Sequence, residues 1–473
     1  MGEPETGSDV KALNSIRIAG HDVLPLVEGG KGISISNGES SGAWAAAGGI
    51  ATFSCVNADS YDANGNIIPQ VYLGRTRRER HEELVRFAID GGVAQAKIAY
   101  ERARGGVIHM NVLWEMAAAE RVLNGVLERA RGLINGITCG AGMPYRVAQI
   151  AADFSVPYYP IISSARAFRA LWKRAYHKFA DLLGGVVYED PWLAGGHNGL
   201  SNSEDAEHPE DPYPRVVELR RHMRDYGLGE TPIIMAGNVW FLREWDNWIG
   251  NPELGPIAFQ FGTRALLTEE SPISDAWKQR LMTLQKGDVF LNHFSPTGFW
   301  SSAVDNAFMK ELKERNDRQI AYTTQEVGDH ACELPIGARN RIVYVTLHDR
   351  ARAQRWIAAG FTDALRTPDS TLIFVAPGKA NEIRTDQIDC MGCLSQCKFS
   401  NWAQNEQRTT GRKTDPRSFC IQKTLQAISH SDDIEDQLMF AGHAAYRFAS
   451  DPFYSNGFIP SVKQLIERLQ TGD

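Results

Sequence analysis

The sequence predicts an α/β protein built on a parallel (β/α)8 barrel, a TIM barrel, with a further α/β insertion in its C-terminal part. Three observations predict it: eight short apolar runs before residue 263, amphipathic helical patterns between most of them, and glycine-rich turns directly after several. Eight strands with helical crossovers favour a closed barrel over an open sheet. The predicted strands are residues 23–30, 48–54, 106–114, 132–138, 158–164, 184–190, 231–237 and 256–262.

Helical patterns separate the predicted strands, and the clearest cover residues 81–103 and 166–183. This alternation stops after the eighth strand. Residues 330–385 contain two apolar runs around a helical segment, which is typical of a small α/β insertion, and a cysteine-rich segment follows. We therefore predict a barrel over residues 1–270, the insertion and a cluster-binding region over 271–430, and a C-terminal segment over 431–473 that packs back on the barrel.

Composition and charge exclude several classes of function. The chain has 473 residues, 43% of them hydrophobic and 23% charged, and its formal net charge is -7. This balance gives no overall basic character that would suggest a nucleic-acid partner. No apolar run approaches the roughly 18 residues that a membrane span requires, and the polar start "MGEPETGSDV" lacks the features of a secretion signal. We expect a cytoplasmic protein whose seven cysteines form no disulfide framework.

Glycine-rich turns follow several predicted strands, at the face where a barrel of this kind builds its active site. Any one of them could simply be a turn that favours glycine. Together they would let a flat ring and a phosphate approach the backbone closely, as flavin mononucleotide (FMN) does. The residues expected at this site are Gly29, Gly30, Lys31, Gly32, Gly195, Gly196, Ala236, Gly237, Asn238, Gly262 and Thr263.

One histidine follows the sixth predicted strand, within "GGHNG" at residues 195–199. Histidine titrates near neutral pH, and the small neighbour Gly196 leaves room for the imidazole to lean over a bound ring. A histidine that only braces its loop is the alternative interpretation. We predict that His197 is the catalytic base.

Four of the seven cysteines are candidate metal ligands: Cys390, Cys393, Cys397 and Cys420. The spacing of the first three lets a tight loop aim their thiols at one centre, while the distant fourth closes the site. A zinc ribbon would more often pair two ligands with two. The arrangement favours an iron-sulfur cluster, with zinc and uncommitted thiols as alternatives. The other three, Cys55, Cys139 and Cys332, are expected to be buried as small apolar residues.

Five stretches, in this order along the chain, resemble the nitronate monooxygenase (2-nitropropane dioxygenase) family of FMN enzymes. They are "EGGKGISISNGESSGAWAAAGGIATFS", "GGHNG", "PIIMAGNV", "QFGTRALLTEE" and "FAGHAAYRF". Within the family, "VPYYPIISSARAFRALWKR", "SPTGFW" and the cysteine cluster are most similar to the bacterial acyl-carrier-protein dehydrogenase/isomerases of unsaturated fatty acid synthesis. That branch carries FMN and a [4Fe-4S] cluster, and the resemblance implies both for this chain.

The resemblance also implies roles for single residues. Asn111 and Glu189 match positions near the flavin ring, although Asn111 could cap a turn and Glu189 could pair with an arginine. The amides of Gly237, Asn238, Gly262 and Thr263 would hold the phosphate. This chain departs from the family at Lys31, where methionine is common, and in the extra segment 330–385.

The implied reaction begins when His197 removes a proton beside an acyl thioester carbonyl while a hydride passes to the flavin. The same imidazole would then move the double bond. The implied partners are an acyl carrier protein with a medium-chain acyl group, O2 as a candidate electron acceptor, and a second copy in a homodimer. The basic stretches 75–80 and 215–224 are candidate contacts for the acidic carrier, with solvated helix faces as the alternative. A nitronate monooxygenase using O2 and a non-catalytic flavin and iron-sulfur redox protein remain alternative functions.

Overall fold

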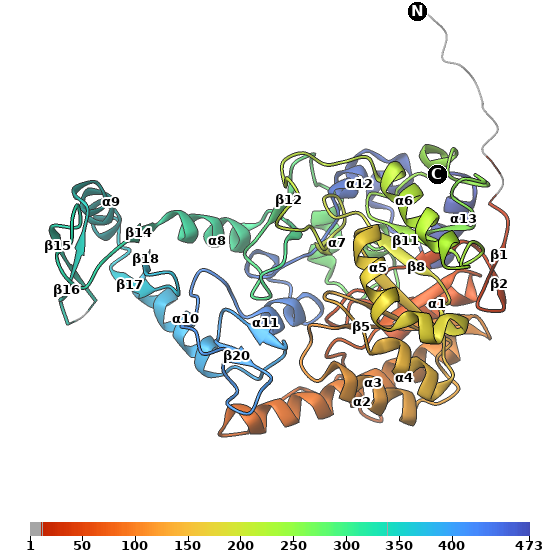
Figure 1. The fold of residues 1–473 in the computed structure, drawn as a ribbon, viewed down its shortest axis with the longest axis horizontal. Helices are drawn as coiled ribbons and strands as arrows, with labels where there is room; N and C mark the ends of the chain where they lie inside the picture. The colour runs from red at the N-terminus through yellow and green to blue at the C-terminus, as the bar shows by residue number, and fades with distance from the viewer. Residues whose placement is uncertain (1–10, 12, 338) are drawn as a thin grey trace, which may run out of the picture.

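A computed structural model describes residues 11, 13–337 and 339–473, and Figure 1 shows its ribbon. The interpretation of the first ten residues as lacking a secretion signal lies outside these described residues. Among the helices that the structure describes, none combines the length and the apolar character that a membrane crossing requires. The division at residues 270 and 430 stays a prediction.

Seven of the eight predicted strands contain one strand of a closed parallel barrel, and the predicted strand 132–138 overlaps β6, which ends two residues later. The TIM-barrel prediction is confirmed. Neighbouring strands pair in parallel around the ring, and β11 closes it by pairing with β3, Phe261 lying opposite Glu28. The barrel strands are β3 (Leu26–Glu28), β4 (Ile50–Ser54), β5 (Val107–Leu113), β6 (Gly136–Gly140), β7 (Tyr158–Ile162), β8 (Val186–Glu189), β10 (Ile233–Ala236) and β11 (Ile257–Phe261).

Helices cover the outside of the barrel (Figure 1). Those between the strands are α1 (Gly38–Ala46), α2 (Arg77–Ala103), α3 (Ala119–Arg129), α4 (Val147–Phe154), α5 (Ala165–Arg174), the short helix η1 (Tyr176–Leu182) and α6 (Pro212–Asp225). Single 3-10 turns follow the last two strands, η2 (Leu242–Trp245) and η3 (Arg264–Leu266), and α7 (Asp275–Leu281) comes next. The closing helix α13 (Val462–Gln470) packs beside α1.

Two apolar layers stabilise this arrangement. One fills the barrel interior with side chains such as Val27, Ile50, Val187 and Ile234, and the other lies between strands and helices. The hairpin of β1 (Ile16–Ile18) and β2 (His21–Val23) contributes apolar side chains to the interior layer. The barrel is therefore a packed core, and its open space lies at the ends of the strands.

The predicted α/β insertion is present, and it begins earlier than residue 330. Helix α8 (Ala307–Asp317) leads into a unit with its own apolar core, which Figure 1 shows projecting away from the barrel. The unit contains β14 (Gln319–Ala321), β15 (Cys332–Ile336), β16 (Arg341–Val345), α9 (Leu347–Ala358), β17 (Asp363–Arg366), β18 (Thr371–Val375) and α10 (Pro377–Ile388).

The remaining elements lie over the carboxyl ends of the barrel strands and along its side. A small antiparallel sheet joins β9 (Gly196–His197), β12 (Val289–Asn292) and β13 (Ser301–Val304). The cysteine region contributes β19 (Gln396–Cys397), β20 (Trp402–Ala403) and α11 (Ile421–Gln426). After it come η4 (Ala427–Ser429), η5 (Ile434–Asp436), η6 (His443–Tyr446), α12 (Arg447–Ser450) and η7 (Pro452–Gly457).

Candidate active site

A large pocket opens at the carboxyl ends of the barrel strands and, with its open mouth, spans about 1660 Å³. We call it the main pocket. Its walls contain the predicted base and every residue predicted to hold FMN: Gly29, Gly30, Lys31, Gly32, Asn111, Glu189, Gly195, Gly196, His197, Ala236, Gly237, Asn238, Gly262 and Thr263. The structure brings them together from five different strand ends. Their individual roles stay predictions.

The turn after β3 forms one wall, and its glycines are needed for close packing. A Cβ at Gly30 would clash with the side chain of Asn111, and one at Gly32 would lie 2.8 Å from Cβ of Val56. A larger residue would have to displace a neighbour, because the backbone on both sides is fixed by the barrel. These positions can therefore present bare backbone to a flat ring.

The turns after β10 and β11 form a second wall that suits an anion. Gly237 has a φ of 94° and Asn238 a φ of 56°, while a Cβ at Gly262 would meet open space. Among the hydrogen bonds of the described residues outside helices and strands, none is donated by the backbone amides of these three residues or of Thr263. Four amides at two adjacent strand ends are thus available, as in the phosphate sites of other barrels.

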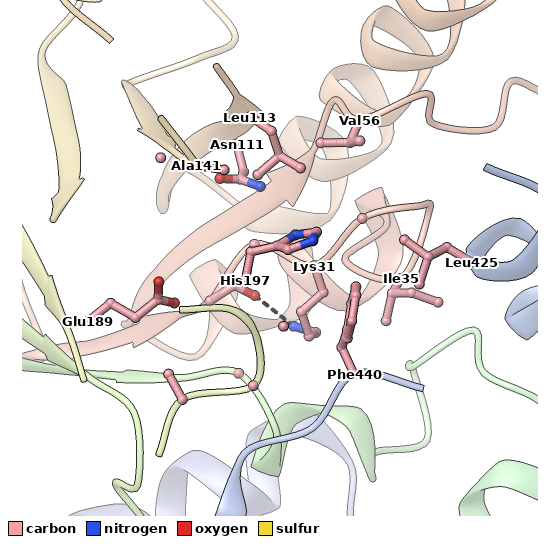
Figure 2. A pocket seen from close by; sticks show the side chains of 18 of the residues that line it. Lys31, Ile35, Val56, Asn111, Leu113, Ala141, Glu189, His197, Leu425 and Phe440 are labelled. Carbon is pink, nitrogen blue, oxygen red and sulfur yellow. Dashed lines mark hydrogen bonds between the residues drawn. The ribbon is translucent and has the colours of Figure 1, made fainter. Parts of the chain in front are cut away.

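A buried ion pair lies at the end of β3. The Nζ atom of Lys31 is 3.2 Å from a carboxylate oxygen of Glu28 and 2.8 Å from the carbonyl oxygen of Gly29. Glu28 is only 2% exposed, and its second carboxylate oxygen has no partner among the described residues. Burial lowers the pKa of Lys31, and the neighbouring carboxylate opposes that shift. Figure 2 shows Lys31 extending into the pocket beside His197.

His197 extends into the same space from β9, whose backbone pairs with Ser301. Burial lowers the pKa of His197 to about 4, so the imidazole is neutral near pH 7 and can accept a proton. Its Nε2 atom is 2.7 Å from the hydroxyl oxygen of Ser295, which is 2.8 Å from that of Thr297. The ring of Phe440 packs edge-on at 5.3 Å between centroids.

Residue-by-residue interpretation of the sequence missed Glu28, Ser295 and Thr297. All three lie within quoted stretches, "EGGKG" and "SPTGFW", but nothing in their local pattern indicates a contact with Lys31 or His197. The contact between Ser295 and His197 joins residues 98 positions apart. This contact becomes visible only when the three-dimensional structure places the two loops next to each other.

Glu189 lies at the end of β8, on the side of the pocket away from Ile35 and Leu425 in Figure 2. Burial raises the pKa of Glu189 to about 8, and the charge of Asp190 adds to the shift. The carboxyl group therefore keeps its proton at neutral pH and can donate a hydrogen bond. The arginine partner considered for Glu189 is absent from the ion pairs of the described residues.

The four predicted cysteine ligands line one small cavity of about 310 Å³, which we call the cysteine cavity. The hydroxyl of Ser400 donates to the sulfur of Cys390 at 3.0 Å. Among the described residues, no three histidine, cysteine, aspartate or glutamate side chains are grouped as a single metal ion requires. Cys393 and Ile421 line both this cavity and the main pocket, so the two spaces share a wall.

The other three cysteines lie outside the cavity. Cys55 and Cys139 are fully buried, as predicted, and burial raises the pKa of both thiols. Cys332 is only partly buried, because β15 is an edge strand of the small hairpin in the insertion unit. The expectation of full burial was therefore wrong for Cys332.

Two arginines at the start of α2 bind the cysteine segment. Arg77 donates to the carbonyl oxygens of Ser400 at 2.7 Å and Gln387 at 3.2 Å. Arg80 donates to the carbonyl oxygens of Cys390 at 3.1 Å and Ile388 at 2.9 Å. These two guanidinium groups hold the segment against α2, so they are not free to contact a partner.

In the second basic stretch, Arg221 and Arg224 are exposed, whereas Arg215 and Arg220 are engaged inside the chain. Arg215 forms ion pairs with Glu204 and Glu210. Arg220 is buried and donates to backbone carbonyl oxygens, including those of Leu254 and Pro256. Neither of these two arginines is available at the surface.

The family model for nitronate monooxygenase matches residues 133–472, which include His197 and the four cysteines. The chain belongs to the nitronate monooxygenase family. It is therefore a flavin-dependent oxidoreductase, in agreement with the prediction from the quoted stretches. No curated protein matches the chain.

Two solved structures share the fold across nearly the whole chain. FabK from Thermotoga maritima has 13% sequence identity and a TM-score of 0.50, and the match covers 98% of this chain and 93% of FabK. The enoyl reductase domain of MlnA, from the macrolactin biosynthesis cluster of Bacillus amyloliquefaciens, has 12% identity and a TM-score of 0.53, with coverage of 95% and 93%. At such identities the likeness concerns the fold.

Proposed function

We propose that the protein is an FMN-dependent acyl-carrier-protein dehydrogenase and isomerase that introduces a double bond during unsaturated fatty acid biosynthesis. The observation that carries the proposal is a partly buried, neutral histidine among the predicted FMN residues, next to apolar side chains. Those side chains include Ile35, Val56, Leu113, Leu425 and Phe440, which surround His197 and Lys31 in Figure 2. An acyl chain needs such walls, whereas a small nitronate does not.

The residues of the main pocket fit FMN. The free amides of Gly237, Asn238, Gly262 and Thr263 suit its phosphate, and the bare turn after β3 suits a flat ring. Asn111 and the protonated Glu189 are side chains able to donate hydrogen bonds to ring heteroatoms. When bound, FMN supplies the acceptor for the hydride that leaves the substrate carbon two positions from the thioester carbonyl.

The proton chemistry belongs to His197. Its neutral imidazole takes the proton from the carbon next to the thioester carbonyl, and loss of that proton together with the hydride leaves a 2-enoyl thioester. Once that proton has left the imidazolium for solvent, the neutral ring removes a proton from C4 and returns it to C2, which moves the double bond to position 3 without net oxidation. Ser295 orients the ring through Nε2. The apolar wall at Phe440 keeps water from competing for the proton.

The four cysteines of the cysteine cavity are proposed ligands of a [4Fe-4S] cluster. Four thiols converge on one cavity, yet no three of them are grouped for a single ion. In a cubane cluster each thiolate binds a different iron atom, so the four sulfurs need not share one centre. Zinc would draw all four sulfurs to one centre, about 2.3 Å from each. Such a cluster exchanges single electrons, and the reduced thiols that it needs agree with the proposed cytoplasmic location.

A nitronate monooxygenase that oxidises alkyl nitronates with O2 is the second candidate function. The family match itself favours it, since the matched residues include His197. Both candidates use the same base and the same flavin, so the substrate distinguishes them. Homodimer formation remains a separate proposal.

Anaerobic mixing separates the candidates. Decanoyl-acyl-carrier protein should bleach the flavin absorbance, while propionate 3-nitronate should not. Bleaching by the nitronate alone would establish the second function, and bleaching by neither would favour a redox protein without this catalysis. The variant His197→Ala should retain FMN and lose bleaching. Unimpaired reduction in that variant would remove His197 from the mechanism.

A further inference from the structure

Helix α2 extends beyond the barrel on the face that contains the main pocket. It has 27 residues, about 40 Å of helix, whereas the barrel helices α1 and α3–α6 have between 8 and 14. A Cβ at Gly91, in the middle of α2, would clash with the carbonyl oxygen of Ala58, just after the carboxyl end of β4. The first half of α2 therefore lies above the strand ends, next to the cysteine segment (Figure 1).

Exposed arginines and exposed apolar side chains gather around this overhanging end. Leu73 is 79% exposed, Ile388 69% and Val71 55%, although large apolar side chains are usually buried. We call the surface formed by these three residues with Arg75, Arg78 and Arg412 the basic rim.

Hydrogen bonds join the parts of the basic rim. Arg80 donates to the carbonyl oxygen of Ile388, and Arg77 donates to that of Asn401 at 3.2 Å. The side-chain oxygen of Asn401 accepts from the amide of Thr410, and Arg412 donates its own amide to the hydroxyl of Thr410. The three segments of the rim thus lie side by side.

The rim places three arginines without a carboxylate partner, within the part of the chain that the structure describes, on a chain whose net charge is -7. Among the described residues, the guanidinium groups of Arg75, Arg78 and Arg412 form no ion pair and no hydrogen bond. The nearby carboxylates of Glu79 and Glu83 accept from backbone amides and form no ion pair with these three arginines. Glu79 accepts from the amides of Arg75 and Thr76, and Glu83 accepts from that of Leu73.

The rim is also continuous with the wall of the main pocket. Gln70, one residue before the rim begins, donates to the carbonyl oxygen of Asn57 at 3.1 Å. Asn57 lines the main pocket and donates to the side chain of Gln422, another lining residue, at 2.7 Å. A partner on the rim would therefore be next to the pocket.

We propose that the basic rim is the docking surface for an acidic, pantetheine-bearing carrier protein, an inference that rests on the proposed function. Unpaired arginines around apolar side chains are the composition of a protein interface that recognises an acidic partner. A carrier on this surface can extend its pantetheine arm into the main pocket. Of the arginines in the two basic stretches predicted as contacts, only Arg75 and Arg78 have guanidinium groups without a partner among the described residues.

The experiment is a charge reversal, Arg75→Glu with Arg78→Glu. The apparent KM for decanoyl-carrier protein should rise about tenfold at unchanged kcat, because these arginines act before the chemistry. The KM for decanoyl-pantetheine, which lacks the protein, should not change. The matched control is Arg350→Glu with Arg355→Glu, two exposed arginines of α9, for which both KM values should stay the same.

Binding of fluorescently labelled holo-carrier protein supplies a readout independent of turnover. The Kd should rise about tenfold in the rim variant and remain unchanged in the α9 control. An unchanged Kd, or an equal rise in the control, overturns the docking surface even if acyl thioesters reduce the flavin. If no thioester reduces the flavin but the Kd still rises, the proposed function fails and the surface stands. Conversion of a dimer to a monomer by the rim variant would instead assign the rim to a contact between copies.

Discussion

The main pocket and the cysteine cavity share a wall at Cys393 and Ile421, but they are built in different ways. The pocket collects side chains from barrel strands whose register is set by continuous parallel pairing, such as Met235 opposite Phe259. The cavity consists of a loop and the first turn of α11, and it is attached to α2 by side-chain contacts to backbone carbonyls. The barrel therefore preorganises the pocket, whereas the shape of the cavity depends on a few long side chains.

The largest effect is expected from removing two cysteines that line only the cysteine cavity. The double variant Cys390→Ala with Cys397→Ala should lose nearly all iron and sulfide, since two thiols cannot hold a cubane. FMN should stay bound, because the strand ends are unchanged. Chemical analysis of iron, sulfide and flavin measures this. Cys332→Ala, outside both spaces, is the control, and loss of flavin together with iron would contradict the separate construction of the two sites.

The next effect concerns the base. Because the proposed base is the imidazole of His197, His197→Gln should slow flavin reduction by decanoyl-carrier protein at least a hundredfold. Stopped-flow absorbance follows this rate. Ser295→Ala, which removes the contact at Nε2 and keeps the base, should slow it less. Equal losses in both variants would show that the hydroxyl does more than orient the ring.

The rate of flavin reduction should change tenfold per pH unit outside the range set by two titrating groups. His197 must be neutral to accept a proton, so the rate should fall as pH drops through about 4. Glu189 keeps its proton below about 8, so its hydrogen bond should be lost as pH rises through that value. Flavin reduction measured between pH 3.5 and 9.5 should be flat between these limits. The variant Glu189→Gln should lose the upper limit alone.

A smaller effect is expected from the ion pair at the end of β3. An ammonium in the pocket stabilises the negative charge of reduced flavin, so Lys31→Met should lower the midpoint potential by about 30 mV, a tenfold change for two electrons. Spectroelectrochemical titration measures the potential. Lys31→Arg keeps the positive charge and is the control. An unchanged midpoint potential in Lys31→Met would mean that the carboxylate of Glu28 already cancels the charge of Lys31.

The smallest effect is on the attachment of the cysteine segment. Arg77→Ala removes four hydrogen bonds to part-buried carbonyl oxygens, and each carbonyl left unpaired costs about 1–3 kcal/mol at most. Hydrogen exchange of residues 387–408 should quicken several-fold, while exchange in the barrel strands stays the same. Arg78→Ala, one residue further on α2 and without such bonds, should change neither.

The eight strands and the pocket residues could be predicted because they depend on local pattern. Strands of a parallel barrel are buried on both faces and appear as unbroken apolar runs, as in Ile233–Ala236. Glycines at the strand ends mark places where the backbone packs closely against a neighbouring side chain or a ligand, as Gly30 packs against the side chain of Asn111. Parallel pairing then brings all carboxyl ends to one face, so distant glycines and His197 meet without further information.

The partners of the arginines and of Glu28 could not be predicted in this way. Arg77 and Arg78 are adjacent and chemically identical, yet Arg77 reaches across to Ser400 while Arg78 points to solvent. Which one binds a carbonyl depends on helix rotation and on where the cysteine segment lies.

By itself, the sequence determined the barrel, the glycine-rich strand ends, the histidine and the four thiols. These features can be recognised from the periodicity of apolar residues, the spacing of motifs and the residue types within short segments. Tertiary structure alone decided that Ser295 contacts His197, that Lys31 pairs with a buried Glu28, and that the thiols share a wall with the pocket. Such contacts join loops far apart in the chain. Their geometry comes from packing, which no local pattern records.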